Sequence, residues 1–140
     1  MSNNAEVELK LPVIPDIELS ATKTAEVISK HMNLSEEKTG EISMAIIESC
    51  INAFEHSKTK EIYIHFIVTA KNLTIKVRDK GIGFDKSKVE IPNIENKLNN
   101  DERKRGWGLQ LITELMDTVE YDSDETGTTV TMTKKREDNE

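Results

Sequence analysis

Three stretches of the chain alternate apolar and polar residues with a period of two, which is the spacing of a half-buried strand. The first is short and stops at Pro12, and the other two are joined by the residues AKN. We expect these two strands to pair as a hairpin. The inward positions that the alternation predicts are Val7, Leu9 and Leu11, then Ile62, Ile64, Phe66 and Val68, then Leu73, Ile75 and Val77.

Apolar residues recur at helical spacing in three other segments. The first helix is predicted from about Leu19 to Met32, with Ser20 as its candidate N-cap. The second begins after Ser35, another candidate N-cap, and ends near His56, while the third begins at Gly106. Their predicted inward positions are Ala21, Ala25, Ile28 and Met32, then Ile42, Ile46, Ile47, Ile51 and Phe54, then Leu109, Ile112 and Leu115 or Met116.

The remaining segments are a polar loop and a final hairpin. Residues 84–105 are highly charged and poor in apolar side chains, and a loop of that length is usually a lid, a binding loop or disordered. Residues 119–121 and 128–134 form two short strands over the turn SDETG. The resulting order, β-α-α-β-β-loop-α-β-β, predicts an α+β two-layer sandwich with a mixed, mostly antiparallel sheet covered on one face by helices.

Length and composition predict one soluble domain of residues 1–140, with an ordered core over about 7–134. A net charge of -7 argues against direct binding of nucleic acid, and no apolar run is long enough to cross a membrane. Cys50 is the single cysteine and has no basic neighbour at helical spacing, so we expect a packed thiol in a reducing cytoplasm.

The second predicted helix carries a polar stripe of Glu48, Asn52 and either Glu55 or His56. A solvated helix face is the simplest interpretation. Alternatively, the Asn52 amide oxygen is a suitable ligand for Mg²⁺, which takes one or two protein oxygens beside phosphates and water. Glu48 would then be free to act as a base.

The sequence VRDKGIGFD places a carboxylate where the preceding strand places hydrocarbon. Asp79 continues the inward alternation of Val77, and a carboxylate buried there without a donor costs several kcal/mol. An exocyclic amino group of a purine would satisfy it. Gly81 and Gly83 allow a ligand to approach the main chain closely, although a strand that ends in an Asp-Gly turn explains the same letters.

Two further motifs are compatible with a nucleotide site. RGWGLQLI places two glycines where a helix is predicted to begin, after Lys104 and Arg105, and helix N-termini bind phosphate. GTTVTM places Thr128 on the inward side of the last strand, with the same parity as Val130. A loop-to-helix turn and ordinary β propensity are the simpler explanations of these two motifs.

Taken in order along the chain, these motifs resemble the Bergerat-fold (GHKL) ATPases, the superfamily of gyrase, heat-shock chaperone, mismatch-repair and histidine-kinase ATP domains. ESCINAFEH resembles the N box, DKGIGFD the G1 box and GWGLQL the G2 box. A chain with ExxxNAxxH and GxGLxLIxxLMD is also similar to the bacterial anti-sigma factors that double as serine protein kinases.

The resemblance implies a role for each motif residue in binding ATP and Mg²⁺. Asp79 would accept a hydrogen bond from the adenine amino group, Asn52 would coordinate Mg²⁺, and Glu48 would be the general base. Residues 84–105 would form the ATP lid, and either Lys104 or Arg105 would meet the γ-phosphate. The remaining nucleotide contacts would come from Gly81, Gly83, Gly106, Trp107, Gly108, Leu109 and Thr128.

The resemblance also implies a partner-switching cycle in stress response or sporulation. The ATP-bound protein, expected to be a homodimer, would hold a sigma factor away from RNA polymerase. It would also phosphorylate a serine of a STAS-type antagonist. Two alternatives remain, which are a nucleotide-gated binding module without kinase activity and a switch kinase that regulates a phosphatase.

Overall fold

The computed structural model describes residues 4–81 and 103–137. These residues form three helices and five strands in the predicted order. Of the lid predicted over residues 84–105, residues 84–102 lie outside the described residues. The elements are β1 Ala5–Pro12, α1 Glu18–His31, α2 Glu36–His56, β2 Ser57–Val68, β3 Asn72–Gly81, α4 Arg103–Leu115, β4 Thr118–Asp124 and β5 Gly127–Lys135.

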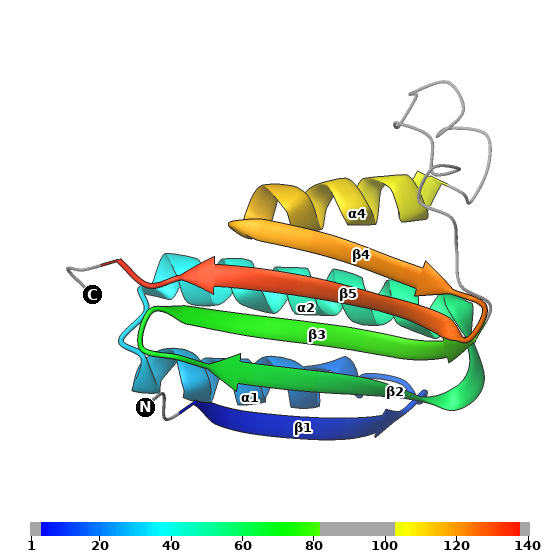
Figure 1. The fold of residues 1–140 in the computed structure, drawn as a ribbon, viewed down its shortest axis with the longest axis horizontal. Coiled ribbons are helices and arrows are strands. Elements are labelled where there is room, and N and C mark those ends of the chain that lie inside the picture. The colour runs from blue at the N-terminus through cyan, green and yellow to red at the C-terminus, as the bar shows by residue number, and fades with distance from the viewer. Residues whose placement is uncertain (1–3, 82–102, 138–140) are drawn as a thin grey trace.

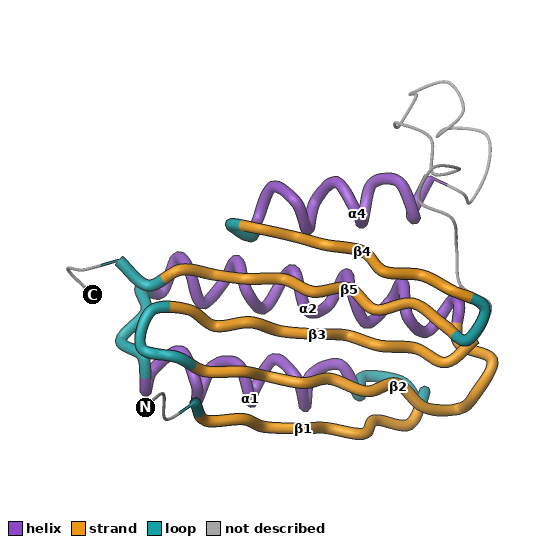
Figure 2. The backbone as a smooth tube through the Cα atoms, in the orientation of Figure 1, coloured by secondary structure: helices purple, strands orange, loops and turns teal. Residues whose placement is uncertain are grey.

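The strands form one sheet in the order β1-β2-β3-β5-β4, and the helices cover one of its faces (Figures 1 and 2). This arrangement confirms the predicted α+β two-layer sandwich with helices on one face, and among the described strands the mostly antiparallel sheet is antiparallel in all four pairs. Two pairs are hairpins, and the helix pair α1–α2 returns the chain to the end where β1 stops (Figure 2). No helix in the described part of the chain is long and apolar enough to cross a bilayer.

The core lies between the sheet and the helices and confirms the strand predictions. The predicted inward residues of β2 and β3 are all buried. On α2 the buried stripe is Ile42, Ile46, Cys50 and Ala53, so the prediction that Ile51 points inward is wrong. Ile51 follows Cys50 directly and is rotated about 100° from it around the helix, which leaves its side chain 37% exposed.

One predicted helix cap is confirmed and the other is wrong. The Ser35 side chain accepts a hydrogen bond from the Lys38 backbone amide at 3.1 Å and caps α2. Ser20 lies inside α1, because backbone bonds from Leu19 to the Asp16 carbonyl and from Ser20 to the Ile17 carbonyl start the helix earlier.

The predicted start of α4 is wrong by three residues, and its polar anchoring was not predicted. The helix begins at Arg103, three residues before the predicted Gly106, since Arg and Lys are good helix formers. Tyr121 donates a hydrogen bond from its hydroxyl to the Leu109 carbonyl at 3.3 Å. The buried Lys134 ammonium donates to the Leu115 carbonyl and to Glu41, the latter at 3.2 Å. These polar contacts hold α4 at a defined position beside α2 and β4.

Candidate functional site

All four sequence motifs come together at one end of the molecule. The last turn of α2, the end of β3, the start of α4 and the start of β5 lie at the same end (Figure 1). Strand pairing supports this placement, because Asp79 on β3 faces Thr128 on β5. Gly81 faces Ser57, the residue directly after α2. The antiparallel topology therefore collects segments that are far apart in the sequence.

Asp79 is buried on the inward face, as predicted. Its side chain is 3% exposed, and Oδ1 has no hydrogen-bond partner among the described residues. Burial raises the pKa of this carboxyl to about 6, although the Thr128 backbone amide and the charge of Arg78 act in the opposite direction. A buried acceptor that lacks a donor is costly, so this position favours a ligand that brings one.

Asp79, Thr128 and Ser123 form a polar row across the neighbouring strands β3, β5 and β4. Thr128 is buried, and its hydroxyl lies 3.1 Å from the Ser123 hydroxyl on β4. Sequence reasoning missed Ser123. Its parity with Val119 and Tyr121, which both pack against the core, would have indicated an inward position.

Gly127 is a second residue that sequence reasoning did not assign to the site. Its φ of 151° is a conformation that other residues rarely adopt, and a Cβ there would clash with the Asp79 carbonyl oxygen. The glycine therefore lets β5 begin directly beside the end of β3. A Gly that precedes the inward Thr128 is the sequence signal for this close approach.

On α2 the predicted polar stripe divides by burial. Asn52 is 7% exposed and its Nδ2 has no partner in the described residues, whereas Glu48, one turn earlier, is half-buried and Glu55 is exposed. A fully solvated face is therefore excluded for Asn52. Cys50 is buried, and burial raises the pKa of its thiol to about 12, which keeps the thiol protonated.

The remaining predicted contacts are described only in part. Gly81 is the last residue of β3, and Gly83 lies outside the described residues. Lys104, Arg105, Gly106, Trp107 and Gly108 are placed by their backbone in the first turns of α4. The first four amides of a helix have no intrahelical partner, so those of residues 103–106 face the site end.

The residues present are compatible with a nucleotide and its metal ion. The described residues contain no cluster of three or more His, Cys, Asp or Glu side chains for a metal. Asn52 nevertheless offers one buried, unsatisfied amide position. A half-turn of that amide exchanges nitrogen and oxygen, so it can face a phosphate oxygen or a cation. Mg²⁺ held largely by phosphates and water needs no more from the protein.

Sequence comparisons agree with this arrangement. The profile of the histidine kinase-like ATPase domain family matches residues 16–134. A serine-protein kinase RsbW of Bacillus licheniformis is 33% identical over 135 residues, covering 91% of this chain and 84% of the relative. A serine-protein kinase RsbW of Bacillus cereus is 32% identical over 141 residues, covering 96% of this chain and 87% of the relative.

Structural comparisons show the same fold in more distant proteins. The RsbU and RsbW domains of Rv1364c from Mycobacterium tuberculosis match with a TM-score of 0.68 at 18% identity, over 95% of this chain and 33% of that protein. A chain of the SiaB–SiaC complex of Pseudomonas aeruginosa matches with a TM-score of 0.62 at 8% identity, over 91% of this chain and 88% of that chain. The α+β Bergerat architecture, the family match and the RsbW relatives together show that this chain belongs to the histidine kinase-like ATPase domain family.

Proposed function

We propose that this protein binds Mg·ATP at the end of β3 and phosphorylates a serine of a partner protein. The observation that carries the proposal is the buried Asp79 carboxylate with its unpaired Oδ1, at the end of the molecule where the Asn52 amide is also unsatisfied. A purine amino group is a donor of suitable size for the first position. The ATPase-domain family and the RsbW relatives support a nucleotide as the ligand.

Each residue of the site has a distinct proposed task. Asp79 accepts a hydrogen bond from the adenine amino group, with Thr128 beside it and with Gly81 and Gly83 leaving room for the ring. Asn52 holds the metal ion, which neutralises phosphate charge when bound. The phosphates lie against the first turns of α4, which contain Gly106, Trp107, Gly108 and Leu109 and whose unpaired amides are those of residues 103–106. Either Lys104 or Arg105 meets the γ-phosphate.

Glu48 is the proposed general base. It lies one turn before Asn52 on the same side of α2 and is half-buried. The serine hydroxyl of the partner attacks the γ-phosphorus, its proton passes to the Glu48 carboxylate, and ADP leaves with the electrons of the broken P–O bond. Phosphoryl transfer depends mainly on positioning and charge neutralisation, so these few groups are sufficient.

The proposed partners follow from the RsbW relatives and belong to bacterial partner switching in the cytoplasm. The substrate is a STAS-type anti-sigma antagonist, and the ATP-bound protein, as a homodimer, sequesters a sigma factor. Nucleotide state and partner affinity are coupled, and that coupling must be reciprocal. A chain of similar fold occurs in a solved two-protein complex, which supports a role in partner binding.

The test is phosphoserine formation on a STAS protein encoded beside this gene, in the presence of Mg·ATP. We expect wild-type protein to transfer phosphate and Glu48→Gln to lose transfer by at least about a hundredfold, the low end for general base removal. ATP affinity should be retained in that variant. Glu55→Gln is the matched control, because it removes an exposed carboxylate from the same helix.

Two outcomes would change the proposal. Tight ATP binding without transfer to any co-encoded STAS protein would favour a nucleotide-gated binding module. No binding of ATP or ADP would contradict both functions.

A further inference from the structure

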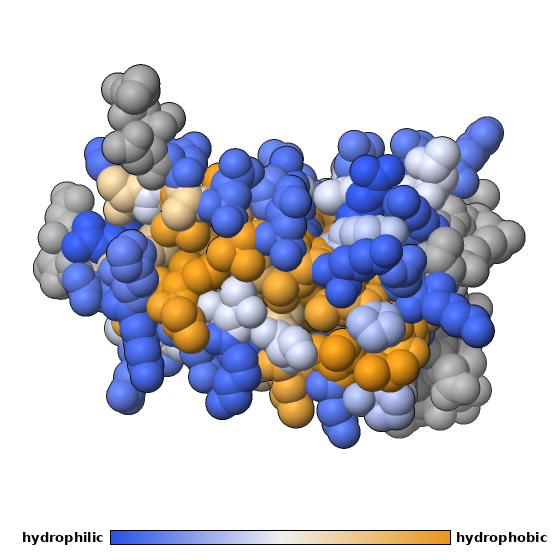
Figure 3. Space-filling view, turned by 90° about the horizontal axis from the view of Figure 1, so that it is seen from below, coloured by the Kyte–Doolittle hydropathy of each residue, from blue (hydrophilic) through white to orange (hydrophobic). Residues whose placement is uncertain are grey.

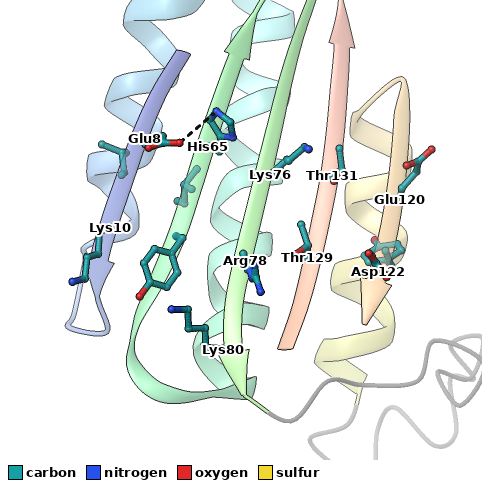
Figure 4. A pocket seen from close by; sticks show the side chains of 14 residues that line it. Glu8, Lys10, His65, Lys76, Arg78, Lys80, Glu120, Asp122, Thr129 and Thr131 are labelled. Atoms are coloured by element: carbon teal, nitrogen blue, oxygen red, sulfur yellow. Dashed lines mark ion pairs between the residues drawn. The ribbon is translucent and has the colours of Figure 1, made fainter. Parts of the chain in front are cut away.

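A large open hollow lies on the sheet face that the helices leave uncovered, away from the inward Asp79. It has a volume of about 1000 Å³ and is lined by side chains from all five strands of the sheet (Figure 4). Neither the sequence motifs nor the proposed kinase chemistry uses this face. Its residues follow two complete rows across the sheet, Glu8–His65–Lys76–Thr131–Glu120 and Lys10–Tyr63–Arg78–Thr129–Asp122.

The centre of the hollow is a column of cations on one strand. Lys76, Arg78 and Lys80 project from the same side of β3 (Figure 4). Residues two apart on a strand are separated by about 7 Å along it, so the Cα atoms of these three residues are evenly spaced. Lys80 lies 4.8 Å from the centre of the Tyr63 ring. Among the described residues, Lys76 and Arg78 are in none of the ion pairs found.

The acidic side chains on this face stand on the strands to either side of the column, and Asp124 of β4 interacts electrostatically with Arg78. On the β1 side, Lys10 pairs with Glu61 at 3.0 Å and His65 contacts Glu6 at 2.6 Å. On the other side, Glu120 and Asp122 stand on β4, two strands or about 10 Å from β3. The threonines of β5 fill the space between and add hydroxyl groups. The result is a narrow cationic strip on a protein whose net charge is -7.

We propose that this strip binds an acidic, extended segment of a partner protein. Carboxylates at every second residue of an extended peptide are also about 7 Å apart, so they match the spacing of Lys76, Arg78 and Lys80. Thr129 and Thr131 can hydrogen-bond the same carboxylates. The acidic border on β4 restricts the ligand to a single line of negative charge along β3, because a wider anionic surface would meet like charges.

The experiment measures binding of a fluorescent peptide that alternates Glu and Thr. The double variant Lys76→Gln/Arg78→Gln should bind it about tenfold more weakly or worse, as expected for two lost charge contacts. Lys30→Gln/Lys71→Gln is the matched control, since it removes the same charge from α1 and from the β2–β3 turn. A peptide of equal composition with its Glu residues in one block should bind more weakly than the alternating one.

Two further readouts locate the site and its electrostatic origin. In methyl NMR spectra the Thr129 and Thr131 signals should shift on peptide addition, while Thr113 on α4 should not. Added salt should weaken the binding, because exposed charges are screened over about 10 Å at 0.1 M. Thermal melts of both double variants check that the outward substitutions leave the fold intact.

Several results would overturn the proposal. One is that the alternating peptide does not bind even at about 1 mM, a concentration at which weak specific complexes still form. Another is that the two double variants lose peptide affinity equally. Tighter binding of single-stranded RNA to the same threonines would identify a different ligand class. A change of oligomeric mass in Lys76→Gln/Arg78→Gln would show that a second copy of the chain covers the strip.

Discussion

Asp79 is the residue at which folding and the proposed nucleotide chemistry conflict. Its pKa of about 6 lies roughly two units above the ordinary 3.8, because burial removes water from the carboxylate. Two units correspond to about 3 kcal/mol of destabilisation of the folded protein when the group is ionised. A ligand that donates a hydrogen bond to Oδ1 would recover part of that energy, which links the cost in the free protein to affinity.

Replacing Asp79 separates these two effects. Asp79→Asn keeps the shape and removes the charge, so the free energy of unfolding at pH 8 should rise, by up to about 3 kcal/mol. ADP affinity should fall by at least about tenfold, since the carboxylate acceptor is lost. Urea unfolding and calorimetric titration measure the two quantities. Asp122→Asn, on the exposed side of the sheet, is the control, and an unchanged ADP affinity in Asp79→Asn would contradict the site.

The pH dependence of stability provides a second test of Asp79. Because its folded pKa is raised, the folded protein binds more protons than the unfolded chain between about pH 4 and pH 6. The contribution of Asp79 to stability is therefore fully present below pH 4 and is lost as pH rises through 6. The difference in unfolding free energy between Asp79→Asn and wild type should grow over this window and level off above it. A difference that is constant with pH would show that the carboxyl is not perturbed.

At the scale of elements, local patterns predicted most of the sheet and fewer of the helix details. The alternation in β2 and β3 is correct at every inward position, including Asp79, because one buried face fixes the register. Ser35 caps α2 as predicted, since capping depends on neighbouring residues alone. The predictions for Ser20 and for the start of α4 were wrong because each helix begins a few residues before its apolar periodicity becomes visible. The prediction for Ile51 was wrong because the buried stripe of α2 passes through Cys50.

The site could be predicted to a similar extent. The burial of Asp79 and Thr128 was predicted from their parity with the apolar residues of their strands. That they lie at the same end of the molecule as Asn52 follows from the strand order and the direction of α2. The Ser123–Thr128 contact depends on the register between β4 and β5, which no local pattern specifies. The charged hollow on the open face likewise requires the strand order, because its rows combine five separate strands.

Gly127 allows a prediction about the β3–β5 junction. Gly127→Ala would place a Cβ against the Asp79 carbonyl oxygen and would be strained at φ 151°. We expect the free energy of unfolding to fall by about 1–3 kcal/mol and ADP affinity to fall with it, because β5 must move away from Asp79. Gly40→Ala is the control, since a Cβ there meets nothing within 4 Å and should stabilise α2. Equal effects of both variants would contradict a special role for Gly127.

At the scale of the whole molecule, the site exists only in the complete fold. Its residues come from α2, β3, α4 and β5, and the sheet joins them through the Asp79–Thr128 and Ser57–Gly81 pairs. Binding of a ligand to the folded state alone stabilises it by about 2.7 kcal/mol at a concentration one hundred times the dissociation constant. Stabilisation by nucleotide therefore reports on the assembled site and not on any single segment.

The base of the nucleotide should decide whether that stabilisation occurs. Adenine presents an amino group to Asp79, whereas guanine presents a carbonyl oxygen at the corresponding ring position, which would face a carboxylate acceptor without a proton between them. ADP should therefore raise the melting temperature and slow hydrogen exchange at Lys80 and Thr128. Exchange at Leu73 and Lys134, at the far end of the same strands, should change less. GDP at equal concentration should do neither, and equal stabilisation by GDP would show that Asp79 does not select the base.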